Sequence, residues 1–350
     1  MFNDNLNDPK KVVKVGIVFF GTRGGGPELL LQVSNSLSRA NMEATILVSE
    51  KNEKIGNVTE SGHKIIYLDA PNKMRSVPRW MLKLGKKLNH LTEQVLALEL
   101  DSLIFLQPHY LDYFLVKRFT KLGKSITYTV HDFPPHLGEF FPPKILTRAI
   151  VRMVDNTITL NSESYNSILK FCPKTIRCKL PKFVSLQADT PKTLDILFIG
   201  RVRKYKGLTL LRSAFEILDT SKYEVMVAGS GKIKTKFGPD VTVKNGWISH
   251  DRLVNFVRQS KVLVLPYLEA SQSGLIEIAK GVGTTIVVTP VPNLVSQVQD
   301  GGTVVVSESF SPKHLASAIE RALGGEAVHH QIDHAIMSLD EYVVKVVCKV

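Results

Sequence analysis

Cysteine is scarce in this 350-residue sequence, and long hydrophobic runs are missing. The three cysteines, Cys172, Cys178 and Cys348, are odd in number and lack CxxC or metal-type spacing, so we expect reduced thiols that pack as small hydrophobic side chains. No apolar run approaches the roughly 18 residues of a membrane span, and residues 1–11 lack the apolar core of a signal peptide. These absences predict a cytoplasmic protein.

Several signatures of metal and nucleic-acid sites are also missing. No D-x-D triplet and no His/Asp cluster with ligand spacing occurs, which predicts a site that works without a metal or other cofactor. The net charge of +13 favours an anionic partner. Because the chain has no RNP-type aromatic signature, no zinc-finger spacing and no Gly-Arg-rich tail, nucleic acid is the least supported anion. Anionic lipid and a sugar nucleotide remain open.

What the sequence does contain is two successive series of apolar β-type runs with helical stretches between them. The first series predicts strands at 14–21, 43–50, 64–68, 103–106, 125–130 and 156–160, with a helix at 27–41. The second predicts strands at 195–202, 223–229, 241–247, 262–267, 284–289 and 303–307, and helices at 207–218, 250–258, 273–281 and 312–323. Two such series indicate an α/β protein with two doubly wound, Rossmann-like domains facing a cleft.

The boundary between the two domains is expected in the polar, proline-containing stretch 179–193. We therefore expect one domain over residues 1–185 and a second over 186–325. The last segment, 326–350, ends in the helical pattern SLDEYVVKVVCKV.

A glycine-rich loop, FFGTRGGGPELLL, follows the first expected strand. Gly24, Gly25 and Gly26 let the backbone approach a ligand, and Pro27 suits the first position of a helix. A dinucleotide fold competes with this interpretation because Glu50 ends the second strand, but the glycine spacing is not GxGxxG. The loop is either a ligand contact or a plain tight turn.

A basic turn, FIGRVRKYKGL, links a strand to a helix in the second series. There Arg201 offers a fixed fork of donors and Lys206 a point charge, which together can neutralise a diphosphate. The alternative is a solvated basic face. We prefer the site because an acidic segment accompanies it further along the chain.

That segment is VLVLPYLEASQSGLIEIAKGVG, residues 262–283, where a buried strand becomes a helix. Backbone N–H groups of Ser273, Gly274 and Leu275 at the helix start favour an anion. Glu269 and Glu277 flank this turn. In a doubly wound sheet, the crevice beyond such a strand end is where ligands bind, so the turn is placed to hold a phosphorylated molecule.

Together these stretches resemble the family-4 (group 1) retaining glycosyltransferases of the GT-B fold, in a bacterial polysaccharide-type subgroup. The basic turn, the GSGK at 229–232 and the E-x7-E pair look like that family's C-terminal domain, while the glycine-rich loop and TYTVHDFPPH (127–136) look like its N-terminal domain. The resemblance implies that residues 1–185 bind the acceptor and 186–325 the nucleotide sugar. It also implies that 326–350 crosses back to the N-terminal domain.

Roles follow from the resemblance residue by residue. It implies that Glu277 binds the ribose, that Glu269 lies near the reacting centre, and that Arg201 and Lys206 hold the leaving diphosphate. Gly25 and Gly26, with Gly24, form the loop that approaches donor and acceptor. The SQSG form departs from the family pattern, because Gln272 stands where the family has glycine and Thr285 where it has proline.

Two histidines follow expected strands. The resemblance places His131 facing the donor sugar, where the following Asp132 could orient its ring; the alternative is a purely structural histidine. His109, in LQPHYLD, also follows a strand, and ligand contact and a structural role are equally open for it.

Residues 73–91 combine an apolar stripe with one-sided charge. The stripe comprises Val77, Trp80, Met81, Leu84, Leu88 and Leu91, and the cations are Lys73, Arg75, Arg79, Lys83, Lys86 and Lys87. This pattern is typical of a helix at an anionic membrane surface, although an ordinary helix packed on the sheet has a stripe too. We expect peripheral contact with the inner face of the cell membrane.

The sequence thus predicts a metal-independent enzyme that moves a sugar from a nucleotide diphosphate donor to a glycan or lipid-linked acceptor, with His131 and Glu269 catalytic. It leaves open whether the donor carries UDP or GDP. A nucleotide-sugar epimerase and a non-catalytic nucleotide-sugar-binding subunit remain alternatives, and an NAD-linked oxidoreductase is the least supported.

Overall fold

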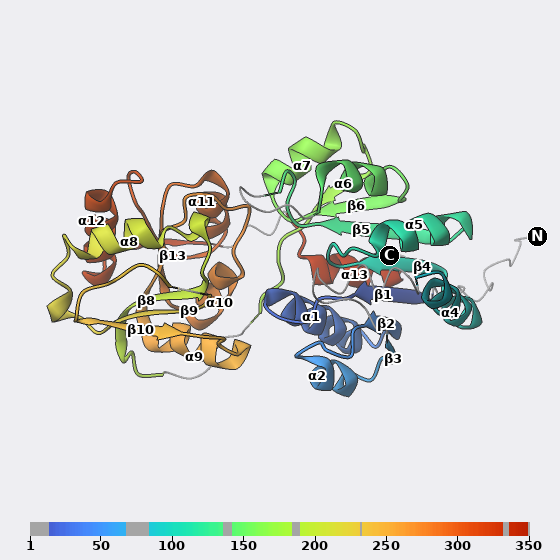
Figure 1. Ribbon diagram of the computed structural model, residues 1–350, viewed down its shortest axis with the longest axis horizontal. Coiled ribbons are helices and arrows are strands. Elements are labelled where there is room, and N and C mark those ends of the chain that lie inside the picture. The colour runs from blue at the N-terminus through green and yellow to red at the C-terminus, as the bar shows by residue number, and fades with distance from the viewer. Residues whose placement is uncertain are drawn as a thin grey trace, which may run out of the picture. The chain divides into compact units, whose positions relative to one another are not determined.

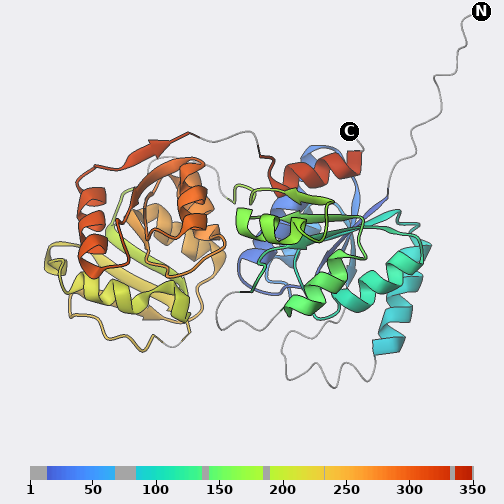
Figure 2. The same ribbon diagram turned by 90° about the horizontal axis from the view of Figure 1, so that it is seen from above.

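The computed structural model describes residues 14–67, 84–135, 142–183, 190–231, 233–331 and 336–348. The chain divides into two compact units. The first unit contains residues 1–129, 145–158 and 340–350, and the second contains 130–144 and 159–339. The two units are made of discontinuous segments, whereas the predicted domains, with boundaries at 185/186 and 325/326, are continuous stretches of the chain. The predicted boundaries stay a prediction. Two sheets with helices packed on them form the framework (Figure 1, Figure 2).

The first sheet has seven strands in the order β3-β2-β1-β4-β5-β6-β7. β1 lies between β2 and β4 and pairs with both in parallel, and all five of its residues are buried. Continuous apolar runs suit such strands because both faces of a parallel sheet are covered. The strands are β1 (Val15–Phe19), β2 (Ala44–Val48), β3 (Lys64–Tyr67), β4 (Ser102–Phe105), β5 (Ser125–Val130), β6 (Asn156–Thr159) and β7 (Thr175–Arg177).

The helices between these strands extend the predicted pattern. They are α1 (Gly25–Arg39), α2 (Ile55–Glu60), α4 (Leu84–Ala97), α5 (Asp112–Lys121), α6 (Lys144–Val151) and α7 (Ser162–Leu169). Helix α1 begins two residues before Pro27, so the prediction that Pro27 takes the first helical position is wrong. Proline is still tolerated there because the N–H groups of the first turn have no partner within the helix.

The second sheet has the order β10-β9-β8-β11-β12-β13-β14, and β14 is antiparallel to β13. Its strands are β8 (Leu194–Arg201), β9 (Val225–Ser230), β10 (Val241–Asn245), β11 (Ser260–Leu265), β12 (Thr285–Val288), β13 (Gly302–Val306) and β14 (Val328–His330). Its helices are α8 (Leu208–Phe215), α9 (His250–Gln259), α10 (Gly274–Val282), α11 (Pro292–Gln299) and α12 (Pro312–Leu323). Each predicted strand is present within about two residues of its expected limits.

The strand order of the second sheet brings two predicted motifs together. β8 pairs in parallel with β9 on one side and with β11 on the other. The chain leaves β8 through the basic turn and leaves β11 through the acidic segment, so both follow neighbouring carboxyl ends. In an open α/β sheet, ligands bind where the strand order reverses, and β8 and β11 lie at that point.

The C-terminal helix α13 (Leu339–Cys348) belongs mainly to the first unit. There the Ser36 hydroxyl of α1 donates a 2.7 Å hydrogen bond to Asp340 Oδ2, and the Leu339 and Val343 side chains are fully buried. Within the first unit, both views draw α13 beside α1 (Figure 1, Figure 2). In the part of the chain that the structure describes, no helix is both long and apolar enough to cross a membrane.

Candidate functional site

The basic turn after β8 is fixed against the loop after β11. Gly207 ends the short helix Lys204–Lys206 with a φ of 68°, a conformation that favours glycine. A Cβ at this position would collide with the backbone oxygen of Pro266. The Leu268 N–H also donates a 2.7 Å hydrogen bond to the Tyr205 carbonyl. Glycine is therefore required where the two loops touch.

Lys206 lies over an aromatic ring. Its Nζ lies 3.7 Å from the centroid of the Tyr267 ring and 5.4 Å from that of Tyr205. Burial raises the pKa of Tyr267 well above its ordinary range, which keeps this ring neutral. The ring face attracts the ammonium group without neutralising its charge. Lys206 thus remains a cation that can meet an anionic ligand.

Arg201 is the last residue of β8 and is exposed. The adjoining strand end is built from glycine, because a Cβ on Gly229 would run into the backbone oxygen of Gly200. Arg201 therefore lies at the end of β8 and Lys206 in the turn that follows it, which are the positions that the sequence predicts.

The start of α10 is organised by Gln297, which the sequence did not single out. Gln297 Oε1 accepts from the Ser273 N–H at 2.8 Å, and its Nε2 donates to the Ser273 carbonyl at 3.0 Å and to Glu277 Oε1 at 2.9 Å. Lys280 Nζ lies 3.2 Å from the same Glu277 oxygen. One side chain from α11 thus holds both the turn before α10 and the predicted ribose-binding carboxylate.

The two predicted catalytic residues lie beside a hydrogen-bonded pair of loops. His131 follows β5, and its carbonyl accepts from Asn161 Nδ2 at 2.8 Å. The next residue, Asp132, accepts a hydrogen bond from the Ser271 hydroxyl. Ser271 is two residues beyond Glu269, in the loop between β11 and α10. Within the second unit, the loop that carries His131 therefore contacts the loop that carries Glu269. Asp132 makes this contact with Ser271. That Asp132 also orients the His131 ring stays a prediction.

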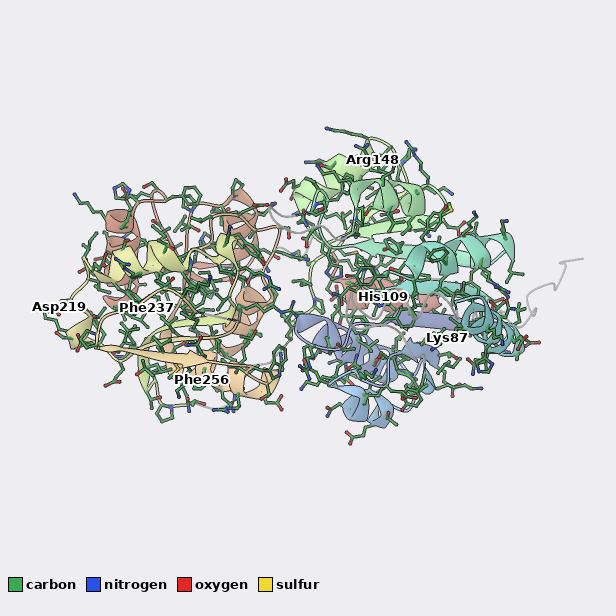
Figure 3. All side chains as sticks on the ribbon, in the orientation of Figure 1. Lys87, His109, Arg148, Asp219, Phe237 and Phe256 are labelled. Carbon is green, nitrogen blue, oxygen red and sulfur yellow. The ribbon has the colours of Figure 1, made fainter. Side chains whose placement is uncertain are left out.

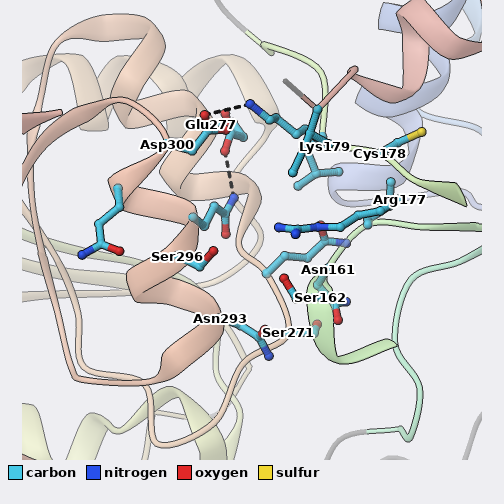
Figure 4. A pocket seen from close by; sticks show the side chains of 16 residues that line it. Asn161, Ser162, Arg177, Cys178, Lys179, Ser271, Glu277, Asn293, Ser296 and Asp300 are labelled. Atoms are coloured by element: carbon cyan, nitrogen blue, oxygen red, sulfur yellow. Dashed lines mark hydrogen bonds and ion pairs between the residues drawn. The ribbon is translucent and has the colours of Figure 1, made fainter. Parts of the chain in front are cut away.

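A polar pocket of about 260 Å³ lies next to this turn, and all its lining residues belong to the second unit (Figure 4). Glu277 contributes to its wall together with Asn161, Arg177, Ser271 and Ser296. The pocket is large enough for several water molecules or a small polar group. Its walls come from β7, α7, α10 and α11 and the loops beside them.

The glycine-rich loop lies in the first unit, at the carboxyl end of β1. Gly24 has a φ of 94° and precedes α1, and its N–H donates to Glu53 Oε1 at 2.9 Å. A Cβ on Gly26 would collide with Gln107 and Phe19, whereas one on Gly25 would meet no atom within 4 Å. The positive φ favours glycine at position 24, and the close Phe19 and Gln107 side chains favour it at position 26. The open space at Gly25 suits the predicted approach to a ligand, which stays a prediction.

His109, labelled in Figure 3, packs its ring 5.1 Å from that of Phe20. Its backbone N–H donates to Asp112 Oδ2 at 2.6 Å, and the Tyr128 hydroxyl donates to the same oxygen at 3.0 Å. Burial raises the pKa of Asp112 to about 8, although these two hydrogen bonds oppose the shift. The contacts around His109 are those of a packed structural residue, and ligand contact stays open.

Other predictions receive partial answers. Cys172 and Cys178 are buried reduced thiols, as predicted. Residues 73–83 of the expected membrane helix, and Lys232 of the GSGK stretch, lie outside the described residues. No group of three or more His, Cys, Asp or Glu side chains that could hold a metal ion is present in the described ranges. The prediction of metal-independent chemistry stays a prediction.

Comparison with known proteins finds a family match in the second half of the chain. Residues 193–324 match the family described as "Glycosyl transferases group 1". The D-inositol 3-phosphate glycosyltransferase of Acidothermus cellulolyticus is 28% identical over 165 residues, which cover 40% of this chain and 37% of that protein. The match therefore spans well under half the length of this curated relative.

Solved structures extend the comparison over nearly the whole fold. Sucrose-phosphate synthase from Thermosynechococcus elongatus has a TM-score of 0.66 at 15% identity, covering 96% of this chain and 94% of that chain. Anabaena HepE in complex with UDP-glucose has a TM-score of 0.60 at 11% identity, with coverage of 96% and 94%. The chain has the GT-B fold, and its residues 193–324 match the group 1 glycosyltransferase family.

Proposed function

We propose that this protein transfers a sugar from a nucleotide diphosphate sugar to an acceptor hydroxyl with retention at the anomeric carbon. One observation carries the proposal. The family match over residues 193–324 coincides with the place where the basic turn after β8 touches the loop that leads to Glu277. Cations, a helix start and a fixed carboxylate thus gather at the carboxyl ends of two neighbouring strands.

The donor is bound by its charged half. Arg201 and Lys206 neutralise the diphosphate, and the N-terminus of α10, at Ser273 to Leu275, adds backbone N–H groups. Glu277 accepts hydrogen bonds from the ribose hydroxyls, with Gln297 and Lys280 holding its carboxylate in place. The HepE structure contains UDP-glucose, which supports a UDP-sugar as the first donor to try.

The transfer itself is a front-side displacement. The bond between the anomeric carbon and the diphosphate oxygen breaks as the acceptor oxygen bonds to the same face, and the acceptor proton passes to the departing diphosphate. Arg201 and Lys206 stabilise the charge that develops on the leaving oxygens, in place of a metal ion. His131 and Glu269 orient the sugar as positive charge develops, and the Gly24–Gly26 loop contacts donor and acceptor.

We propose a glycan or lipid-linked glycan as acceptor, in the synthesis of a cell-surface polysaccharide. The one-sided charge of residues 73–91 supports a place at the inner face of the membrane. Both points depend on the sequence pattern.

The first experiment is a thermal-shift series with UDP, GDP, ADP, TDP and NAD, with and without Mg²⁺. We expect one nucleoside diphosphate to stabilise the protein in both conditions, by about 2.7 kcal/mol at a hundred times its dissociation constant. Arg201→Ala and Glu277→Ala should lose most of this response. Arg212→Ala, which removes an exposed arginine paired with Glu216, should keep it.

Turnover then separates the candidate functions. With donor and acceptor supplied, Arg201→Ala should lower kcat by about a hundredfold or more, by analogy with the loss of one preorganised donor. The anomeric configuration of the product, read by NMR, reports retention. Interconversion of the nucleotide sugar without acceptor would establish an epimerase instead. Nucleotide binding without any turnover would establish a binding subunit, and a response to NAD alone would exclude the transferase.

A further inference from the structure

The pocket beside Glu277 contains a charged side chain that the proposed sugar transfer does not use. Arg177, the last residue of β7, is half-buried and extends into the pocket toward the side that carries Ser296 (Figure 4). Among the described residues its guanidinium group has neither a hydrogen-bond partner nor a carboxylate within ion-pair distance. A half-buried guanidinium group that is already partly desolvated gains from an oxyanion, which can accept two parallel hydrogen bonds from it.

The carboxylates of this pocket are already occupied. Asp300 Oδ1 lies 2.8 Å from Lys179 Nζ, and Glu277 Oε1 lies 3.2 Å from Lys280 Nζ. Each acidic group therefore has a donor of its own. Two cations and two carboxylates line the pocket, and among the described residues Arg177 is the one of the four without an ion pair.

Further donors converge on the same space from other elements. Ser162 begins α7 and Ser296 lies on α11; both line the pocket, and neither hydroxyl has a hydrogen-bond partner in the described part of the chain. Asn161 caps α7 by accepting from the Ser164 N–H at 2.8 Å, which leaves the first N–H groups of the helix for a ligand. The positive end of the helix dipole adds to the charge of Arg177.

We propose that this pocket binds a phosphate group, either free inorganic phosphate or the phosphate of a monoester. Donors that approach from β7, α7 and α11 suit a tetrahedral anion better than a planar carboxylate. A cavity of about 260 Å³ also leaves room for a small organic group on the phosphate. The pocket shares Glu277 with the proposed ribose contact, but neither Arg201 nor Lys206 lines it.

The test measures binding of inorganic phosphate and of phenyl phosphate to the full chain, by calorimetry and by thermal shift, with ionic strength matched by sodium chloride. We expect saturable binding to the wild type. Arg177→Gln should weaken it by about tenfold, because charge-assisted hydrogen bonds are lost. Ser296→Ala should weaken it less. Arg152→Gln removes an exposed arginine outside the pocket and should bind as the wild type does.

The outcomes separate both the source of the phosphate and the two proposals. Tighter binding of phenyl phosphate than of inorganic phosphate supports a monoester ligand, and the reverse order supports the free anion. Equal binding by the wild type and Arg177→Gln, or no response beyond that of sodium chloride, would overturn the proposal. An unchanged nucleoside diphosphate response in Arg177→Gln shows that this variant is folded and that Arg177 does not contribute to nucleotide binding.

Discussion

Asp112 shows at the scale of a single residue how burial sets chemistry that the sequence does not display. Its carboxyl group is fully buried, and one oxygen accepts hydrogen bonds from the His109 N–H and the Tyr128 hydroxyl. Burial raises its pKa to about 8 and also raises that of Tyr128. Near neutral pH this aspartic acid therefore holds its proton in the folded protein, whereas in the unfolded chain it is ionised.

We predict that the stability of Asp112→Asn increases relative to that of the wild type as the pH rises. The folded pKa of about 8 is above the ordinary value of 3.8, so the stabilisation from proton binding is complete below pH 3.8 and is lost between there and pH 8. Asparagine does not titrate. The unfolding free energy of the variant, measured in urea, should gain on that of the wild type by roughly 1 kcal/mol per pH unit between pH 5 and 7.

Asp219→Asn is the matched control for this titration. Asp219 is exposed, and its hydrogen bonds with Ser221 and Lys222 lower its pKa, so its variant should show no such gain. Parallel pH profiles for the wild type and Asp112→Asn would contradict the assigned protonation state.

At the scale of elements, the site depends on two loops that are distant in sequence and adjacent in the second sheet. Gly207 touches the backbone of Pro266, and Lys206 lies over the ring of Tyr267. Gln297 then joins α11 to the start of α10. Each contact is local, but each depends on β8 pairing with β11.

We predict that Gly207→Ala destabilises the protein and abolishes the nucleotide response. The left-handed conformation alone costs about 1–2 kcal/mol for alanine, and the collision with the Pro266 carbonyl adds to it. The loss should appear as a lower thermal midpoint and a lower urea midpoint.

Gly25→Ala is the opposite case. A Cβ at Gly25 meets nothing within 4 Å, so the variant should keep its stability. If Gly25 approaches the substrates, transfer should nevertheless fall. Unchanged stability of Gly207→Ala would show that the two loops do not touch as described.

At the scale of the whole molecule, charge is the dominant feature. The chain carries 45 Lys and Arg residues against 32 Asp and Glu, with a pI of about 9.5. The described part of the basic stretch begins α4, where Lys86 is exposed and the Leu91 side chain is buried. Leu91 packs as a core residue, so any membrane contact at this end of the helix involves the polar face.

We predict salt-dependent binding to vesicles that contain anionic lipid, and none to neutral vesicles. Each basic residue near such a surface contributes about 1 kcal/mol, so replacing both Lys86 and Lys87 by Glu should weaken binding by about thirtyfold or more. The double variant Lys234→Glu and Lys236→Glu makes the same change of net charge at exposed positions of the second unit. If both double variants lost vesicle binding equally, net charge alone would explain the binding, and the proposal of an interfacial helix would be contradicted.

Several features of the fold and site were outside the reach of the sequence pattern. β7 and β14 have three residues each, too few to show an alternation of apolar and polar positions. Helices α2, α5, α6, α7 and α11 were not predicted, although α8, α9 and α10 have similar lengths and were. Gln297 and Arg177 belong to such elements, so neither was identified. Tyr205 and Tyr267 lie within the basic turn and the acidic segment, but nothing in the sequence indicated that their rings contact Lys206.

The sequence by itself determined the two βα series and the turns that carry Arg201, Lys206 and Glu277, because a strand covered on both faces must be apolar along its length. Tertiary structure alone decided which turns meet. The order of strands in the sheet sets β8 beside β11, and only then do Gly207, Tyr267 and Gln297 acquire their roles. The same holds for Asp112 and Arg177, since burial and the presence or absence of a partner are properties of the folded chain.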